Sequence, residues 1–339
     1  MKHPFAYTAP DPALERGASN AVRTCLRIQP HEKTTLIADR ACLDIAAALS
    51  HQVDGIGCEV SRFLLEDLAP RPLAVMPAEV LADLETSQVS IFAVQAQTNE
   101  LGSRMQLTEV VHRRKVRHAH MVNITRQIML EGMCADYDQV DELSLRLLDI
   151  ARRAAQVRAT TPAGTEIVAT MNPRYRWLKT SGIISENTWG NLPGGEVWTT
   201  PGEVNGTFVV DGVVGDYLCA KYSDLRETPL TLCVEGNRLK EAHCVNRGLE
   251  DEFWRYTHTD ENSDRVGEFA IGTNIGVRDV IGNILQDEKI PGVHIAFGDP
   301  YGEHTGAEWR SSTHIDVVGR RFDIWAGEVQ IMRDGAFLI

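Results

Sequence analysis

The C-terminal part of the chain carries three short apolar runs: GEFAIGTN at residues 267–274, VHIAFGDPYG at residues 293–302 and SSTHIDVVG at residues 311–319. Each run has the length and composition of a strand, and each contains a residue type that binds metals. If residues 313–318 form a strand, His314 and Asp316 point to the same face, because side chains alternate along a strand. An imidazole and a carboxylate side by side on one rigid element suit a divalent metal ion. The sequence therefore predicts a metal site near the C-terminal end of the chain.

Further ligand types lie at the ends of the expected strands, close to turns. Glu196 follows a Pro-Gly-Gly turn in NLPGGEVWTT, and Tyr301 closes the run that begins before His294. Each residue alone has an ordinary structural explanation, but together the predicted ligands supply two histidines and three carboxylates: Glu196, Glu268, His294, His314 and Asp316. That inventory suits a pair of divalent ions that share a bridging carboxylate or water. The Tyr301 hydroxyl could add a hydrogen bond to a developing oxyanion.

Composition narrows the class of protein. The chain has 339 residues, of which 43% are hydrophobic and 24% charged, as in an ordinary globular protein with room for two domains. A net charge of −13 argues against nucleic acid as a partner. Seven scattered cysteines without a CxxC pair favour reduced thiols, and no apolar run approaches the ~18 residues of a membrane helix. We therefore expect a cytoplasmic protein with no membrane partner.

Periodicity predicts two domains of different fold class, α/β followed by α+β. Strand-like runs at 33–39, 59–65, 89–94 and 118–124 alternate with helical patterns, the last of them at 136–157. Residues 13–158 are thus expected to form a doubly wound, Rossmann-like parallel-sheet domain, although no Gly-rich nucleotide motif follows its strands. Residues 159–339 show short strands between Gly, Pro, Asn and Asp, with helices expected at 249–256 and 278–287. They predict a β-rich, mainly antiparallel domain that holds the metal site.

In their amino-acid sequences and their order, these segments resemble those of the M29 family of metallo-aminopeptidases, the aminopeptidase T or thermophilic aminopeptidase group. The pieces that carry the resemblance are NLPGGEVWTTP at 191–201, VNG at 204–206 and the three C-terminal runs. The resemblance implies a short variant of that family. It implies two metal ions, zinc, cobalt or manganese, with Glu196, Glu268, His294, His314 and Asp316 as ligands. It also implies that Tyr301 stands near the scissile carbonyl, that Glu268 bridges the metals or shuttles a proton, and that the protein is a homodimer.

Three functions remain open at this point. The first is a metallohydrolase, an aminopeptidase or amidase that uses a two-metal-activated water on a small peptide or amide. The second is a mononuclear Fe(II)-dependent ring-cleaving dioxygenase of the dihydroxypyridine type, which shares the architecture. In that branch a His stands where this chain has Glu268, and the equivalent of His294 is absent, so keeping both residues favours hydrolysis. The third is a binding or assembly protein without turnover, which the complete ligand set argues against.

Overall fold

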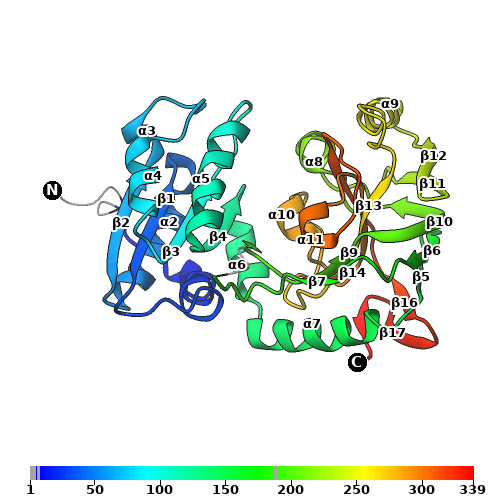
Figure 1. The fold of residues 1–339 in the computed structure, drawn as a ribbon, viewed down its shortest axis with the longest axis horizontal. Coiled ribbons are helices and arrows are strands. Elements are labelled where there is room, and N and C mark those ends of the chain that lie inside the picture. Colours follow the sequence, from blue (N-terminus) through cyan, green and yellow to red (C-terminus); the bar gives the residue numbers. More distant parts are fainter. Residues whose placement is uncertain (1–4, 6–7, 187–189) are drawn as a thin grey trace. The chain divides into compact units, whose positions relative to one another are not determined.

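The computed structural model describes residues 5, 8–186 and 190–339, and the chain divides into two compact units (Figure 1). The first comprises residues 1–138 and 182–194, and the second comprises residues 139–181 and 195–339. Within the described residues, no helix is long and apolar enough to span a membrane.

The first unit is built on a five-stranded parallel sheet with the strand order β2-β1-β3-β4-β8. The strands are β1 (Lys33–Ala38), β2 (Glu59–Leu64), β3 (Val89–Val94), β4 (Arg117–Val122) and β8 (Gly190–Asn191). Its helices are α1 (Glu15–Ser19), α2 (Leu43–Asp54), α3 (Leu65–Leu68), α4 (Ala78–Leu84), α5 (Leu101–Arg114) and α6 (Arg126–Leu130). The four strands predicted from the sequence are all present, because apolar runs of this kind are buried in parallel sheets.

Arg71 joins the loops that follow β1 and β3, at the edge where open parallel sheets commonly bind ligands. Arg71 lies within 2.5 Å of Asp39, which follows β1, and donates at 2.6 Å to the carbonyl of Gln95, which follows β3. It also pairs with Glu100, and all three charged side chains are at most 4% exposed. This network binds the loops at that edge of the sheet to one another.

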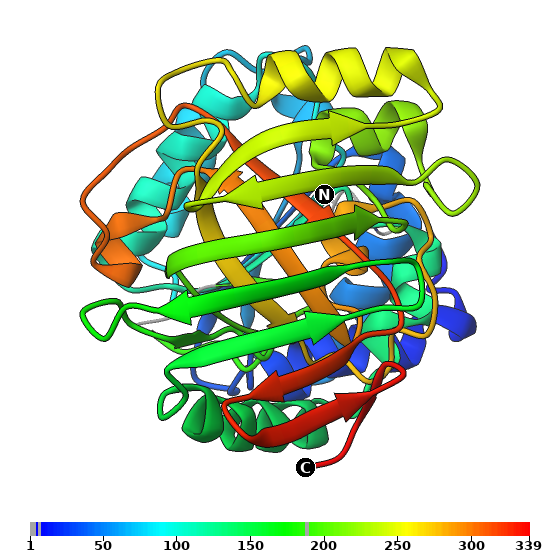
Figure 2. The ribbon, with the colours of Figure 1, turned by 90° about the vertical axis from the view of Figure 1, so that its right-hand side faces the viewer.

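The second unit contains two largely antiparallel sheets (Figure 2). The larger has the order β12-β11-β10-β6-β5-β16-β17-β18, formed by β5 (Gln156–Thr160), β6 (Glu166–Met171), β10 (Pro201–Val210), β11 (Leu230–Glu235), β12 (Arg238–His243), β16 (Asp323–Ala326), β17 (Val329–Arg333) and β18 (Ala336–Phe337). The smaller has the order β15-β14-β13-β9-β7, formed by β7 (Leu178–Lys179), β9 (Glu196–Thr199), β13 (Val266–Gly272), β14 (Gly292–Gly298) and β15 (His314–Val318). The helices are α7 (Tyr137–Ala151), α8 (Asp216–Tyr222), α9 (Arg247–Tyr256), α10 (Ile284–Asp287) and α11 (Gly302–Thr305).

One hydrophobic core joins the two sheets of the second unit. From the larger sheet it receives residues such as Phe208 and Leu232, and from the smaller sheet it receives Phe269, Ile295 and Val317. These core residues alternate along β13, β14 and β15 with residues on the opposite face. The alternation that builds the core therefore also decides which side chains project from the other face of the small sheet.

Three sequence predictions differ from the structure. The expected domain boundary after residue 158 lies later than the observed division at 138/139, because α7 from Gln139 onward and the whole of β5 belong to the second unit. The helix expected at 136–157 ends at Ala151, and β5 begins at Gln156. The helix expected at 278–287 is formed only by Ile284–Asp287. The return of residues 182–194 to the first unit, with β8 beside β4, was not anticipated.

Candidate metal centre

The five predicted ligands lie on four strands of the smaller sheet. Glu196 opens β9, Glu268 lies on β13 and His294 lies on β14, while β15 supplies His314 and Asp316. All five occupy positions that alternate with the core residues of the same strands. The structure thus brings the whole predicted set to one face of one sheet.

Small residues separate the ligands across this face. The five have the following direct opposite neighbours on an adjacent strand: Gly272 for Glu196, Ala296 for Glu268 and Asp316, Ala270 for His294, and Gly298 for His314. The two glycines allow other backbone segments to approach closely: a Cβ at Gly272 would clash with the carbonyl oxygen of Ile290, and one at Gly298 would clash with that of Thr313. The two alanines place only a methyl group beside the ligands. The glycines and alanines of GEFAIGTN and VHIAFGDPYG are therefore part of the site’s architecture.

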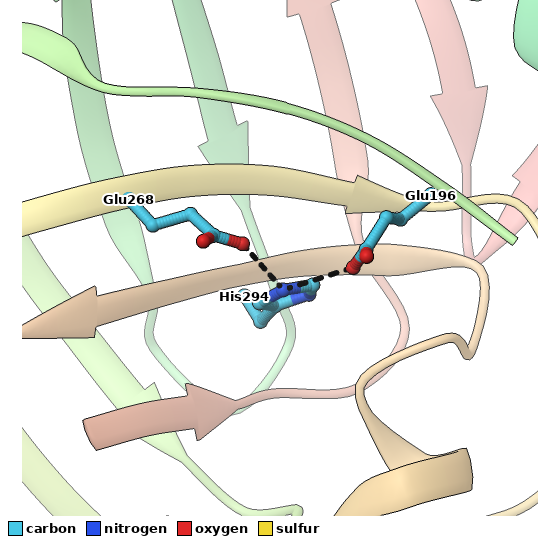
Figure 3. A group of neighbouring side chains, drawn as sticks. All are labelled: Glu196, Glu268 and His294. Atoms are coloured by element: carbon cyan, nitrogen blue, oxygen red, sulfur yellow. Dashed lines mark ion pairs between the residues drawn. The ribbon is translucent and has the colours of Figure 1, made fainter. Parts of the chain in front are cut away.

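Glu196, Glu268 and His294 form a compact buried group with three ligand atoms that all lie within 4.8 Å of one another. His294 Nε2 is 3.5 Å from Glu196 Oε2 and 3.4 Å from Glu268 Oε1 (Figure 3). The three side chains come from neighbouring strands and converge on one point.

A second group shares Glu268 with the first. His314 Nε2 is 3.7 Å from the other carboxylate oxygen, Glu268 Oε2, and 3.4 Å from Asp316 Oδ1. Glu268 therefore turns one oxygen toward each histidine. Residue 268 is the link between two three-residue groups.

Contacts around the ligands orient them. His314 Nδ1 lies 2.9 Å from the carbonyl oxygen of Asp299, so Nδ1 carries the proton and donates it. Nε2 is then the ring nitrogen available to a cation. On the other side of the site, Glu196 Oε1 accepts a hydrogen bond from Thr180 Oγ1 at 2.7 Å and lies 2.7 Å from Lys289 Nζ.

The electrostatics of the group favour binding of positive charge. Burial alone would lower the pKa of His314, but the carboxylates of Asp316 and Glu268 outweigh it and raise that pKa to about 10. Burial would raise the pKa of Asp316, and the neighbouring His314 lowers it to about 2. The pKa of His294 is likewise raised by Glu268 and Glu196 against the effect of burial. The carboxylates thus favour positive charge at both imidazoles, and a cation bound here would compete with protons for the same nitrogens.

Tyr301 stands beside the second group. Its ring centroid is 4.5 Å from that of His314 and 6.0 Å from that of Trp198, and the residue is 42% exposed. Its φ of 47° is unusual for a residue other than glycine, and such strain is frequent at functional sites. The pKa of its hydroxyl is raised well above the usual value, first by desolvation and then by the charges of Asp316 and Glu268. The hydroxyl therefore remains protonated at neutral pH.

The donor set fits divalent metal ions. Two imidazoles and three carboxylates, buried or half-buried on rigid strands, are ligands that zinc, cobalt and manganese accept. Three buried carboxylates so close together are costly without compensating positive charge. Another pair of histidines, His118 and His120, lies in the first unit, where His118 contacts Ser90 at 2.8 Å and His120 at 3.1 Å. Burial lowers the pKa of both histidines, which supports a structural role for them.

Sequence reasoning missed three residues that surround Glu196: Thr180, Glu288 and Lys289. Lys289 is buried between the carboxylates of Glu196 and Glu288, at 2.7 and 2.5 Å. In the sequence, DEKIPG reads as an exposed charged turn before a strand. The sequence offered one signal that these residues belong to the site: the charged turn comes directly before the apolar run that contains His294.

Comparisons with known proteins identify a family and a shared fold. The family model of the thermophilic metalloproteases (M29) matches residues 144–337. Among solved structures, AmpT from Thermus thermophilus has a TM-score of 0.70 at 17% identity, over 96% of this chain and 99% of that chain. The 2,5-dihydroxypyridine dioxygenase from Pseudomonas putida KT2440 also has a TM-score of 0.70, at 12% identity, over 97% and 98% of the two chains. At these identities the two structures show a shared fold.

No curated protein matches the sequence. The family model alone covers more than half of the chain, including all five predicted ligands and Tyr301. The resemblance noted in the sequence is therefore confirmed, and the chain belongs to the M29 family of thermophilic metalloproteases.

Proposed function

We propose that the protein is a metal-dependent aminopeptidase or amidase that holds two divalent ions, zinc, cobalt or manganese. One observation carries the proposal: the two carboxylate oxygens of Glu268 face two different histidines, at 3.4 and 3.7 Å. A carboxylate placed in this way is suited to bridge two cations.

The residues divide naturally between two positions. Glu196 Oε2, Glu268 Oε1 and His294 Nε2 would hold one ion, and Glu268 Oε2, His314 Nε2 and Asp316 Oδ1 would hold the other. Three protein ligands at each position leave room for water and substrate, as catalytic sites require. Ions bound there would lower the pKa of water and polarise an amide carbonyl.

The other roles follow from the protein’s own groups. Because its two oxygens are directed at different histidines, Glu268 would serve as a ligand to both ions and not as the proton shuttle. The protonated Tyr301 hydroxyl, beside His314, would donate a hydrogen bond to the oxyanion that develops on the carbonyl. Small peptides or amides with a free amino end are the proposed substrates, and a homodimer remains a prediction from the family resemblance.

The test combines metal content with two assays. We expect two zinc, cobalt or manganese ions per chain and hydrolysis of aminoacyl-anilide substrates. His314→Ala should abolish hydrolysis and binding of at least one ion, while circular dichroism shows that the chain is still folded. One iron per chain with oxygen uptake on a dihydroxypyridine would instead establish the dioxygenase alternative. Hydrolysis at the normal rate by His314→Ala would refute the site assignment.

A further inference from the structure

Lys289 is a buried cation beside the proposed metal ligands. It follows α10 and directly precedes the turn into β14, and only 3% of its side chain is exposed. Its ammonium lies 2.7 Å from Glu196 Oε1 and 2.5 Å from Glu288 Oε1. Burying an ammonium group costs several kcal/mol unless it is paired, so both carboxylates are needed to hold it there.

The two oxygens of Glu196 have different surroundings. Oε1 receives both Lys289 Nζ and Thr180 Oγ1, each at 2.7 Å. Oε2 faces His294 Nε2 at 3.5 Å. Lysine and threonine thus occupy the first oxygen, and the second is the one that remains for a cation.

No comparable cation supports the second group. In the part of the chain that the structure describes, the ion pairs of Glu268 and Asp316 are to His294 and His314 only. The carboxylates at the His314 position therefore have no direct ion pair with an ammonium among the described residues, and Lys289 acts on Asp316 only from beyond ion-pair distance. At the His294 position, the charge of Glu196 is shared with Lys289.

We propose that Lys289 is a positioning residue that restricts Glu196 to one coordinating oxygen and makes the two metal positions unequal. The position formed by Glu268, His314 and Asp316 binds its ion tightly. The position formed by Glu196, Glu268 and His294 binds its ion more weakly and exchanges it, because a fixed positive charge lies on the far oxygen of one ligand. The inference rests on the proposed two-metal function and adds the order in which the positions fill.

The test is a titration of the metal-free protein with Co²⁺, followed by calorimetry and by visible absorption, which reports coordination number. The wild type should show two steps of unequal affinity. Lys289→Met removes the charge and nearly keeps the volume, so it should tighten the weaker step by at least about tenfold. It should also change the absorption of that step, because Glu196 can then use both oxygens.

Two further variants separate this effect from a general disturbance. Lys179→Met is the matched control, because Lys179 lies on β7, beside the strand of Glu196, and its ion pair is with Asp141 of α7 and not with a ligand. It should leave both steps unchanged. Glu196→Gln keeps the shape of the side chain and should eliminate the weaker step alone, which tests the assignment even if Lys289→Met fails to fold.

The outcomes are distinct. Any of three results would overturn the inference: two binding steps of equal affinity in the wild type, an unchanged weaker step in Lys289→Met, or loss of the tighter step in Glu196→Gln. Binding of a single ion by the wild type would overturn the two-metal function itself.

Discussion

Replacing Glu268 by glutamine tests whether one residue serves two metal positions. Glutamine has nearly the same shape, but it is neutral and offers one oxygen and one amide group. The structure directs the two oxygens of Glu268 at His294 and at His314. Glu268→Gln should therefore weaken both positions at once, whereas Glu196→Gln and Asp316→Asn should each weaken one.

The size of the effect follows from the ligand count. Each position has three protein donors, and Glu268 is one of three in both. Loss of a residue that merely orients a ligand typically costs about 10–100-fold in metal affinity. Removing the charge of a ligand itself should cost at least roughly 100-fold at each position, or about 2.7 kcal/mol per ion.

Equilibrium dialysis with metal analysis measures both affinities directly, and calorimetry gives the number of steps. A thermal melt of each metal-free variant checks that the fold is retained. If Glu268→Gln keeps one ion with the affinity of the wild type, Glu268 does not bridge and the two-position geometry is wrong.

Three further predictions address stability and pH. Arg71→Met leaves Asp39 and Glu100 buried without their cation and should lower the unfolding free energy by about 3–5 kcal/mol. In Arg71→Met, amide hydrogen exchange should become faster in β1–β4 but not in β13–β15. The control Arg40→Met breaks the exposed pair with Asp67 and should lower the unfolding free energy by less than about 1 kcal/mol. Similar losses of stability in both variants would contradict the argument. Burial raises the pKa of Glu100, but the hydrogen bonds from Arg71 outweigh burial and lower this pKa. The contribution of Glu100 to the folding stability is therefore present above its ordinary pKa of 4.5, and it is lost as the pH falls through the lower pKa of the folded state. Acid titration of the unfolding free energy checks this, and the same titration in Arg71→Met should lack the contribution. Metal affinity should rise by roughly tenfold per pH unit for each proton that the metal displaces. This rise should continue up to a pH of about 10, which is the pKa of His314 in the metal-free protein. An Mn²⁺ affinity that does not depend on pH would refute proton displacement.

Much of the geometry of the candidate site was predictable because strand geometry is simple. The spacing of His314 and Asp316 fixes them on one face as soon as residues 313–318 are extended, and the observed strand is His314–Val318. The same period-2 pattern places Phe269 in the core and Glu268 opposite to it. Four parallel strands of the first unit were also predictable, because each is a short apolar run between helical patterns.

The remainder depended on contacts between distant segments. The ammonium of Lys289 is buried because Glu196, more than ninety positions earlier in the chain, pairs with it, and no local pattern encodes that pairing. The sharing of Glu268 depends on the register of β13, β14 and β15, which periodicity does not give. Residues 278–283 carried a helical pattern, but in the structure the helix begins only at Ile284, where the Asn283 side chain caps it.

The path of residues 182–194 has a consequence for how such a protein can be rearranged by recombination. The chain passes between its two units three times, at 138/139, 181/182 and 194/195, and the third passage lies one residue before Glu196. A gene fragment that ends at residue 138 would lack β8 and leave β4 as an unpaired sheet edge, which favours aggregation. A fragment that starts at residue 139 would carry β8 without its partner strand. The parallel sheet and the metal centre can therefore be exchanged only together, so we expect variation within such a chain to come by substitution and loop change, and not by shuffling of its halves.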